Sequence, residues 1–152
     1  MRSTGERVSF FAHSRRKVLP GVKDMLELAK ADGIDNFGNT GRVNKRIWVD
    51  MSYATLVAGK IADLFEDTFY TPLDMPAAVS KAVGIKELRQ HYSEVSHFDD
   101  DPRTVAYLAT LFPEVTIYLL QYGSTGLLYS KAELDQLPNL RRIGMLQKSH
   151  KK

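Results

Sequence analysis

Residues 115–120 read Val-Thr-Ile-Tyr-Leu-Leu, a nearly unbroken run of β-branched, aromatic and aliphatic side chains. Such residues favour extended strands. Because apolar and polar positions do not alternate along it, the run predicts a strand buried on both faces, as in the centre of a parallel sheet. Parallel strands need long crossover connections, which are usually helices. The rest of the chain is therefore expected to alternate between helices and further strands.

Strand-like and helix-like patterns do alternate along the remaining sequence. The apolar residues of the helical segments recur at the i, i+3, i+4 and i+7 spacing of one buried face. Strands are predicted at residues 7–12, 34–38, 68–71, 95–98 and 140–146, and helices at about residues 20–32, 46–65, 77–92, 102–112 and 130–137. This order predicts an α/β fold, a three-layer α/β/α Rossmann-like sandwich around a mostly parallel sheet.

The length of 152 residues suits one domain. We expect a single domain over residues 1–147, followed by a basic tail at 148–152. The chain has no cysteine, which excludes disulfides and thiolate metal sites and fits a reducing compartment. We find no signal-peptide pattern at the N-terminus, and the longest apolar run is too short to cross a bilayer. The expected location is the cytoplasm, without a membrane partner.

The formal net charge is +3, and much of the excess base lies at residues 15–17, 141–142 and 148–152. Short basic runs are more often solvated surface than nucleic-acid contacts. Recognition of nucleic acid would need basic and aromatic residues gathered on one face. A nucleic-acid partner is therefore not expected.

Three adjacent carboxylates, Asp99, Asp100 and Asp101, follow directly after the predicted strand at 95–98. Neighbouring negative charges repel unless a cation or hydrogen-bond donors offset them. Carboxylate oxygens are the ligands that Mg²⁺ prefers, so the cluster suggests a magnesium site. Asp101 has a second interpretation, because an aspartate before Pro102 is a favourable helix N-cap. That alternative explains Asp99 and Asp100 much less well.

A second candidate site is the polar stretch Gly38–Arg42, predicted as a tight loop after the strand at 34–38. Glycines allow close backbone approach, and the Thr40 hydroxyl with nearby N–H groups could hold an anion. An ordinary turn is the alternative. Ligands of parallel sheets collect beyond the carboxyl ends of the strands. We therefore expect Thr40 and the Asp99–Asp100 pair on the same rim of the sheet.

Taken in order, these pieces resemble the haloacid dehalogenase-like superfamily of Mg²⁺-dependent phosphohydrolases. Residues 19–22, Leu-Pro-Gly-Val, resemble the entry to the first helix, and Thr40-Gly41-Arg42 resembles the second motif. Lys81 matches the third motif, with Lys86 as the fallback, and Phe98-Asp99-Asp100-Asp101 matches the fourth. The resemblance extends over most of the chain.

The resemblance implies a hydrolase of the phosphatase type, acting on phosphomonoesters with Mg²⁺. It assigns Asp99 and Asp100 to the metal, Thr40, Gly41, Arg42 and Lys81 to the phosphate, and catalytic roles to Thr40 and Lys81. The intervals between motifs are too short for a cap domain. A capless site is open to solvent, which favours a macromolecular phosphorylated substrate or a partner chain as lid.

One departure from the family concerns its first motif, a pair of aspartates at the end of the first strand. Here residues 8–14 read Val-Ser-Phe-Phe-Ala-His-Ser, without a carboxylate. Either the chain is a catalytically inactive member, or its N-terminus has been truncated or altered. With one carboxylate fewer, Mg²⁺ affinity is expected in the millimolar range at best. The alternative function is a non-catalytic regulatory domain that binds phosphate or a partner on the same scaffold.

Overall fold

The computed structural model describes residues 18, 21–121 and 131–144. The chain divides into two compact units, residues 1–80 and 81–152. Each unit is described by itself, and the single domain expected from the sequence stays a prediction. The strand predicted at 7–12 and the tail at 148–152 lie outside the described residues.

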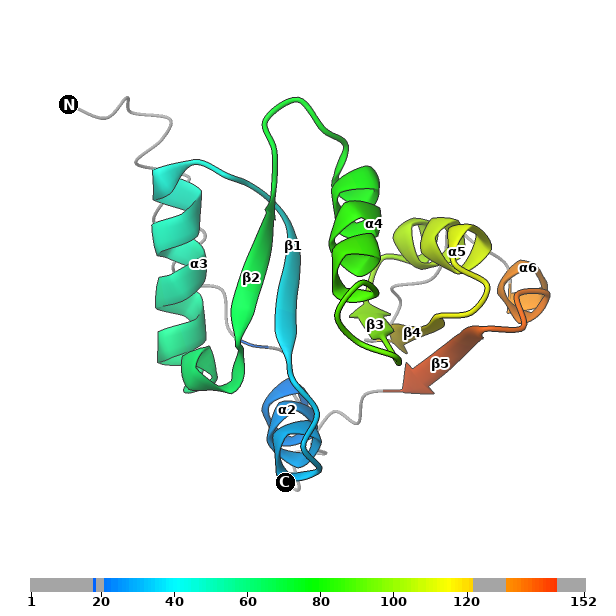
Figure 1. Cartoon of the computed structure of the whole chain (residues 1–152), viewed down its shortest axis with the longest axis horizontal. Helices are drawn as coiled ribbons and strands as arrows, with labels where there is room; N and C mark the ends of the chain where they lie inside the picture. Colours follow the sequence, from blue (N-terminus) through cyan, green and yellow to red (C-terminus); the bar gives the residue numbers. More distant parts are fainter. Residues whose placement is uncertain (1–17, 19–20, 122–130, 145–152) are drawn as a thin grey trace, which may run out of the picture. The chain divides into compact units, whose positions relative to one another are not determined.

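The first unit contains a two-stranded parallel sheet with helical segments before and between its strands (Figure 1). Its elements are helix α2 (Val22–Ala31), strand β1 (Phe37–Val43), helix α3 (Arg46–Ala58), the 3-10 turn η1 (Ala62–Leu64) and strand β2 (Asp67–Thr71). The helix predicted at 20–32 and the strand predicted at 68–71 are confirmed.

The helix predicted to reach residue 65 is shorter, because α3 ends at Ala58. Lys60 adopts the left-handed backbone conformation, with a φ of 56°. That conformation cannot continue a right-handed helix. Met51 and Ile61 nonetheless provide the buried apolar anchors that the helical pattern indicated.

The polar stretch Gly38–Arg42 is part of strand β1, so the loop predicted there is wrong. Regular pairing with β2 continues to Asn39. The register then shifts, and pairing resumes at Val43. Such a β-bulge accommodates extra residues in one strand. Gly38 is needed for close packing, since a Cβ there would lie 2.6 Å from Thr68 Oγ1. The glycine at position 38 is therefore explained by close packing against β2 and not by a turn.

The second unit contains a three-stranded parallel sheet in the order β3-β4-β5. Its elements are strand β3 (Ser96–Asp99), helix α5 (Pro102–Leu111), strand β4 (Thr116–Gln121), helix α6 (Lys131–Asp135) and strand β5 (Leu140–Gly144). Helix α4 (Ala77–Leu88) contains the boundary between the units and contributes Ile85 to the core. The central place predicted for the 115–120 run is confirmed.

The core of the second unit lies between β4 and its helices. Ile117 and Leu119 of β4 and Val105 and Leu108 of α5 are fully buried. Because β4 is paired on both edges and its apolar side chains are covered, it fixes the positions of β3 and β5. Pairing with β4 extends to Asp99 at the end of β3, where the acidic stretch begins.

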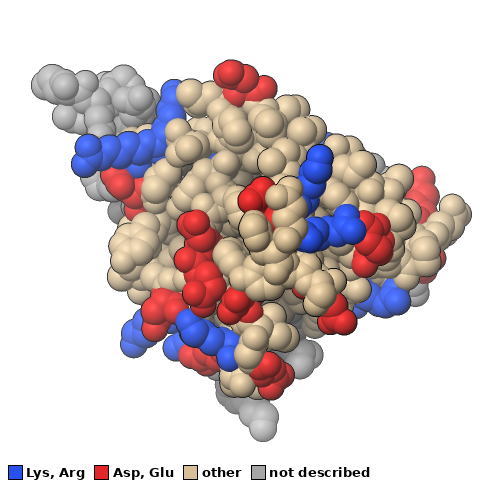
Figure 2. All heavy atoms as spheres, viewed as in Figure 1, with Lys and Arg blue, Asp and Glu red and all other residues tan. Residues whose placement is uncertain are grey.

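The architecture is α/β with parallel sheets and helices, as expected. The described strands form two separate sheets where the sequence suggested one, and the three-layer sandwich is not confirmed. No helix in the described parts of the chain is long and apolar enough to cross a membrane. On the face drawn in Figure 2, the described Lys and Arg side chains are interspersed with Asp and Glu.

Candidate functional site

The acidic stretch at the end of β3 belongs to a buried polar cluster in the second unit. Along β3, His97 and Asp99 are buried whereas Ser96 and Phe98 are exposed. Side chains of a strand alternate between faces, so His97 and Asp99 share the inner face. Lys81 of α4 reaches the same place and forms an ion pair with Asp99. Two residues eighteen positions apart are thus brought into direct contact.

The Asp99 carboxylate accepts hydrogen bonds from donors on both of its oxygens. Oδ2 accepts from Lys81 Nζ and lies 3.3 Å from His97 Nε2. Oδ1 accepts from the backbone N–H groups of Asp100, at 2.9 Å, and Asp101, at 3.1 Å. A carboxylate offers about four lone-pair positions. The four donors therefore satisfy Asp99 completely.

These donors keep Asp99 ionised. Burial alone would raise the pKa of the Asp99 carboxyl, but the hydrogen bond from His97 and the charge of Lys81 hold it well below its usual range. An ionised carboxylate can only accept hydrogen bonds. His97 Nε2 must then carry a hydrogen in order to donate to Asp99.

Asp100 and Asp101 have different surroundings from Asp99. The residue Asp100 is exposed overall, but its carboxyl is partly removed from water, and this desolvation together with the neighbouring charge of Asp99 raises the pKa of that carboxyl. Asp101 accepts from the backbone N–H of Arg103, at 3.1 Å, and from Thr104 Oγ1, at 2.8 Å. Asp101 is therefore the N-cap of α5, one of its two interpretations from the sequence. Of the three residues, Asp99 is buried, Asp101 is half-buried and Asp100 is exposed.

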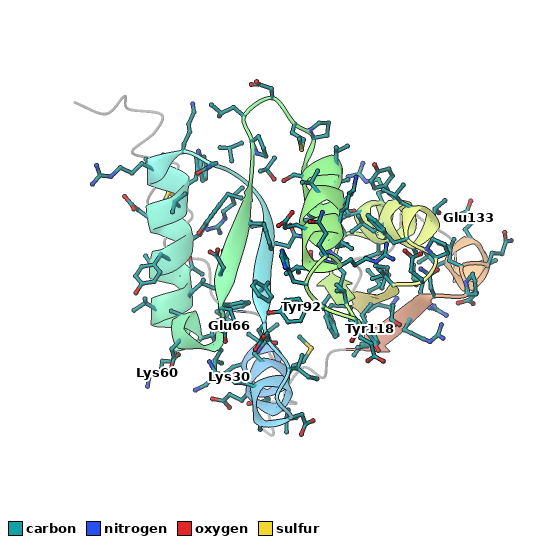
Figure 3. All side chains as sticks on the ribbon, viewed as in Figure 1. Lys30, Lys60, Glu66, Tyr92, Tyr118 and Glu133 are labelled. Carbon is teal, nitrogen blue, oxygen red and sulfur yellow. The ribbon has the colours of Figure 1, made fainter. Side chains whose placement is uncertain are left out.

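Strand β3 is fixed to β4 on the opposite face from Asp99. Tyr118, labelled in Figure 3, pairs with Phe98 in the parallel register, and their rings stack with centroids 4.5 Å apart. The two rings are nearly parallel, at 8°. A stacked cross-strand pair of this kind stabilises the alignment of two strands. The stack helps to set where β3 ends and where the acidic turn starts.

Sequence reasoning missed His97 as a member of the cluster. The available signal was its position two residues before Asp99, which in a strand places both side chains on one face. Of the two lysines considered, Lys81 contacts Asp99, whereas Lys86 is exposed.

The second predicted site, Thr40-Gly41-Arg42, lies in β1 of the first unit. The Thr40 hydroxyl accepts from the Arg42 backbone N–H at 3.2 Å, and the Thr40 carbonyl accepts from Thr71 Oγ1 at 2.9 Å. Arg42 Nη1 donates to Ser52 Oγ of α3 at 2.8 Å. These groups support the local strand structure. Thr40 and Asp99 belong to different units, so their predicted common rim stays a prediction.

The cluster at β3 can be tested for its fit to Mg²⁺. Magnesium sites often use only one or two carboxylates, with waters and phosphate oxygens completing the octahedron. Asp100 fits such a site, because its carboxylate is exposed beside the ionised Asp99. Asp99 itself is already satisfied by four donors. Among the described residues, no group of three His, Asp or Glu side chains forms a ready metal cage.

The chain was also compared with protein-family models, with curated proteins and with solved structures, and none of these comparisons gave a match.

Proposed function

We propose that this chain is a haloacid dehalogenase-like protein of the phosphatase type, and that the end of β3 binds a phosphoryl group together with Mg²⁺. The observation that carries the proposal is the buried ion pair between Lys81 and Asp99. The resemblance assigns these two residues to the third and fourth motifs, which act at one site. The pair lies at the carboxyl end of a parallel strand, the usual place for ligands in α/β proteins.

In this proposal the adjacent aspartates have different roles. Asp100, exposed at the turn, is the metal-facing carboxylate. Asp99 is the anchor, because Lys81, His97 and two backbone N–H groups hold it in place. Asp101 caps α5 and keeps the turn short. When bound, Mg²⁺ would offset the negative charge of the phosphoryl oxygens.

The charge of the cluster makes phosphate binding dependent on the cation. Lys81, paired with Asp99, and Arg103, whose Nε lies 3.7 Å from Asp101 Oδ1, supply two positive charges against the three carboxylates of the acidic stretch. Like charges repel strongly where water is partly excluded. A phosphoryl group alone would therefore be repelled. With Mg²⁺ on Asp100, the same surface becomes able to attract an anion.

A second candidate function is binding without hydrolysis. Two observations favour it: residues 8–14 contain no carboxylate to serve as the family's nucleophile, and the Asp99 carboxylate is satisfied by its four donors. A serine nucleophile would need an activating base. In this second candidate function, the chain binds a phosphoryl group but does not transfer it to an aspartate. A regulatory protein could use such a site to recognise a phosphorylated partner.

The test is a titration of the full chain with MgCl₂ and then with inorganic phosphate, followed by NMR, beside the Asp100→Asn variant. We expect Mg²⁺ binding in the millimolar range and phosphate binding only when Mg²⁺ is present, with both lost in Asp100→Asn. Asp74→Asn, at an exposed aspartate of the first unit, is the matched control and should behave as wild type. Equal phosphate binding without Mg²⁺, or in Asp100→Asn, would contradict the proposal.

An aryl phosphate assay on the same proteins separates the two candidate functions. Mg²⁺-dependent hydrolysis that disappears in Asp100→Asn would support a hydrolase with another nucleophile. Binding without hydrolysis would support the non-catalytic domain.

A further inference from the structure

The buried histidine of β3 is the one member of the cluster to which the resemblance assigns no role. His97 Nε2 lies 3.3 Å from Asp99 Oδ2, and both residues are only 7% exposed. A hydrogen bond between groups removed from water is stronger than the same bond at the surface. The two residues also sit on one strand, two positions apart, so their separation is set by the backbone of β3 itself.

Lys81 alone would hold Asp99 less rigidly. The ammonium group of a lysine is carried on a flexible stem of four carbons. Without His97, Asp99 Oδ2 would keep only this flexible donor, so rotation about the Cβ–Cγ bond would be opposed mainly by the two backbone N–H groups on Oδ1. A second donor on the same strand, with a planar ring and few rotamers, opposes that rotation. Oδ1 then stays against the backbone N–H groups of Asp100 and Asp101.

We infer that His97 is a positioning residue for the ligand site: its Nε2–H fixes Asp99 Oδ2, so that Oδ1 holds the Asp100–Asp101 turn and keeps the Asp100 carboxylate at the surface. The consequence for Mg²⁺ and phosphate rests on the function proposed above. The effect on the turn is a property of the folded chain and can be tested without any ligand.

The structural alternative is that His97 merely fills space in the core. Two substitutions separate the two roles. His97→Gln retains an N–H donor at about the same distance from the backbone, whereas His97→Leu retains bulk and removes the donor. A space-filling role predicts that the leucine variant performs at least as well as the glutamine variant. A positioning role predicts the opposite order.

The first readout is the backbone amide signals of Asp100 and Asp101 in ¹⁵N–¹H NMR spectra, with their hydrogen exchange. In His97→Leu we expect both signals to shift and both amides to exchange faster, while Leu119 in the neighbouring strand is unchanged. His97→Gln should restore the wild-type behaviour. His91→Leu, at an exposed histidine beyond α4, is the matched control. Wild-type signals and exchange in His97→Leu would overturn the inference.

The second readout is Mg²⁺ affinity, which we expect to fall about tenfold in His97→Leu and to stay within about twofold in His97→Gln, as for residues that orient metal ligands. If wild-type protein binds neither Mg²⁺ nor phosphate, the proposed function fails, and the amide readout still decides the role of His97. If His97→Leu does not fold, the ¹⁵N spectrum of wild-type His97 decides. A hydrogen on Nε2 is expected, and an unprotonated Nε2 would overturn the inference.

Discussion

Lys81 Nζ and Asp99 Oδ2 form an ion pair between α4 and β3, with side chains that are only 13% and 5% exposed. Both groups lose most of their hydration on folding. A buried pair of this kind contributes little net stability compared with an apolar pair, yet removal of one partner leaves an uncompensated buried charge. The pair therefore makes the stability of the second unit sensitive to single substitutions.

Substitution of Lys81 by methionine should destabilise the chain by about 3 kcal/mol, because Asp99 would stay buried without its cation. The double variant Lys81→Met/Asp99→Asn should recover much of that loss, since the amide oxygen still accepts from the turn. Urea unfolding measures both. Lys86→Met, on the exposed side of α4, should change stability by no more than about 0.5 kcal/mol. Equal losses at Lys81 and Lys86 would contradict the account.

The low pKa of Asp99 predicts a loss of stability in acid. A carboxyl whose pKa is lowered by folding stabilises the native state above its unfolded pKa of about 4, and this contribution falls as the pH drops below that value. Between about pH 5 and pH 2, unfolding of wild type should therefore be more pH-dependent than unfolding of Asp99→Asn. Parallel pH profiles for the two proteins would show that Asp99 is not held ionised.

Asp100 should have the opposite pH dependence, because folding raises its pKa. Its contribution to stability is fully present below its unfolded pKa of about 4 and is lost as the pH rises through the folded value. Asp100→Asn should then be slightly more stable than wild type at pH 7, by no more than about 0.5 kcal/mol, and equal to it near pH 3. Thermal unfolding at the two pH values tests this. A variant that is less stable at pH 7 would contradict it.

Asn139 joins the end of α5 to the start of β5. Its Nδ2 lies within 3.0 Å of the carbonyl oxygens of Ala109, Phe112 and Val115. Asn139→Asp replaces this donor by an oxygen that faces three acceptors, and should destabilise the chain by about 3 kcal/mol at pH 7. The loss should shrink in acid, when the introduced carboxyl gains a proton. Gln136→Glu, the same chemical change at an exposed position, serves as control and should have little effect.

The parts of the fold that the sequence predicted well are those whose pattern has a single explanation. The apolar run at 115–120 is long enough and uniform enough to specify a central strand. For Asp101 before Pro102 the sequence left two interpretations, and the helix cap is the one that the structure shows. The acidic stretch was placed correctly at a strand end because Phe98 and its neighbours read as a strand.

The remaining parts depend on contacts that a linear pattern does not contain. Gly38–Arg42 has the composition of a turn, but its glycine is set by the close approach of Thr68. His97 lies in a short strand among mixed residues, and its role depends on Asp99 being ionised and on Lys81 arriving from α4. The pairing of the described strands in two sheets, β1-β2 and β3-β4-β5, is likewise not contained in their order along the chain.

The most direct test of the proposed function is phosphate binding to the full chain at saturating Mg²⁺ and after removal of Mg²⁺ with a chelator. We predict that phosphate perturbs the NMR signals of Lys81 and of the turn at Asp100 only in the presence of Mg²⁺, and that Asp100→Asn removes the effect. Phosphate binding that needs neither Mg²⁺ nor Asp100, or no binding at any Mg²⁺ concentration, would contradict a phosphoryl site at the end of β3.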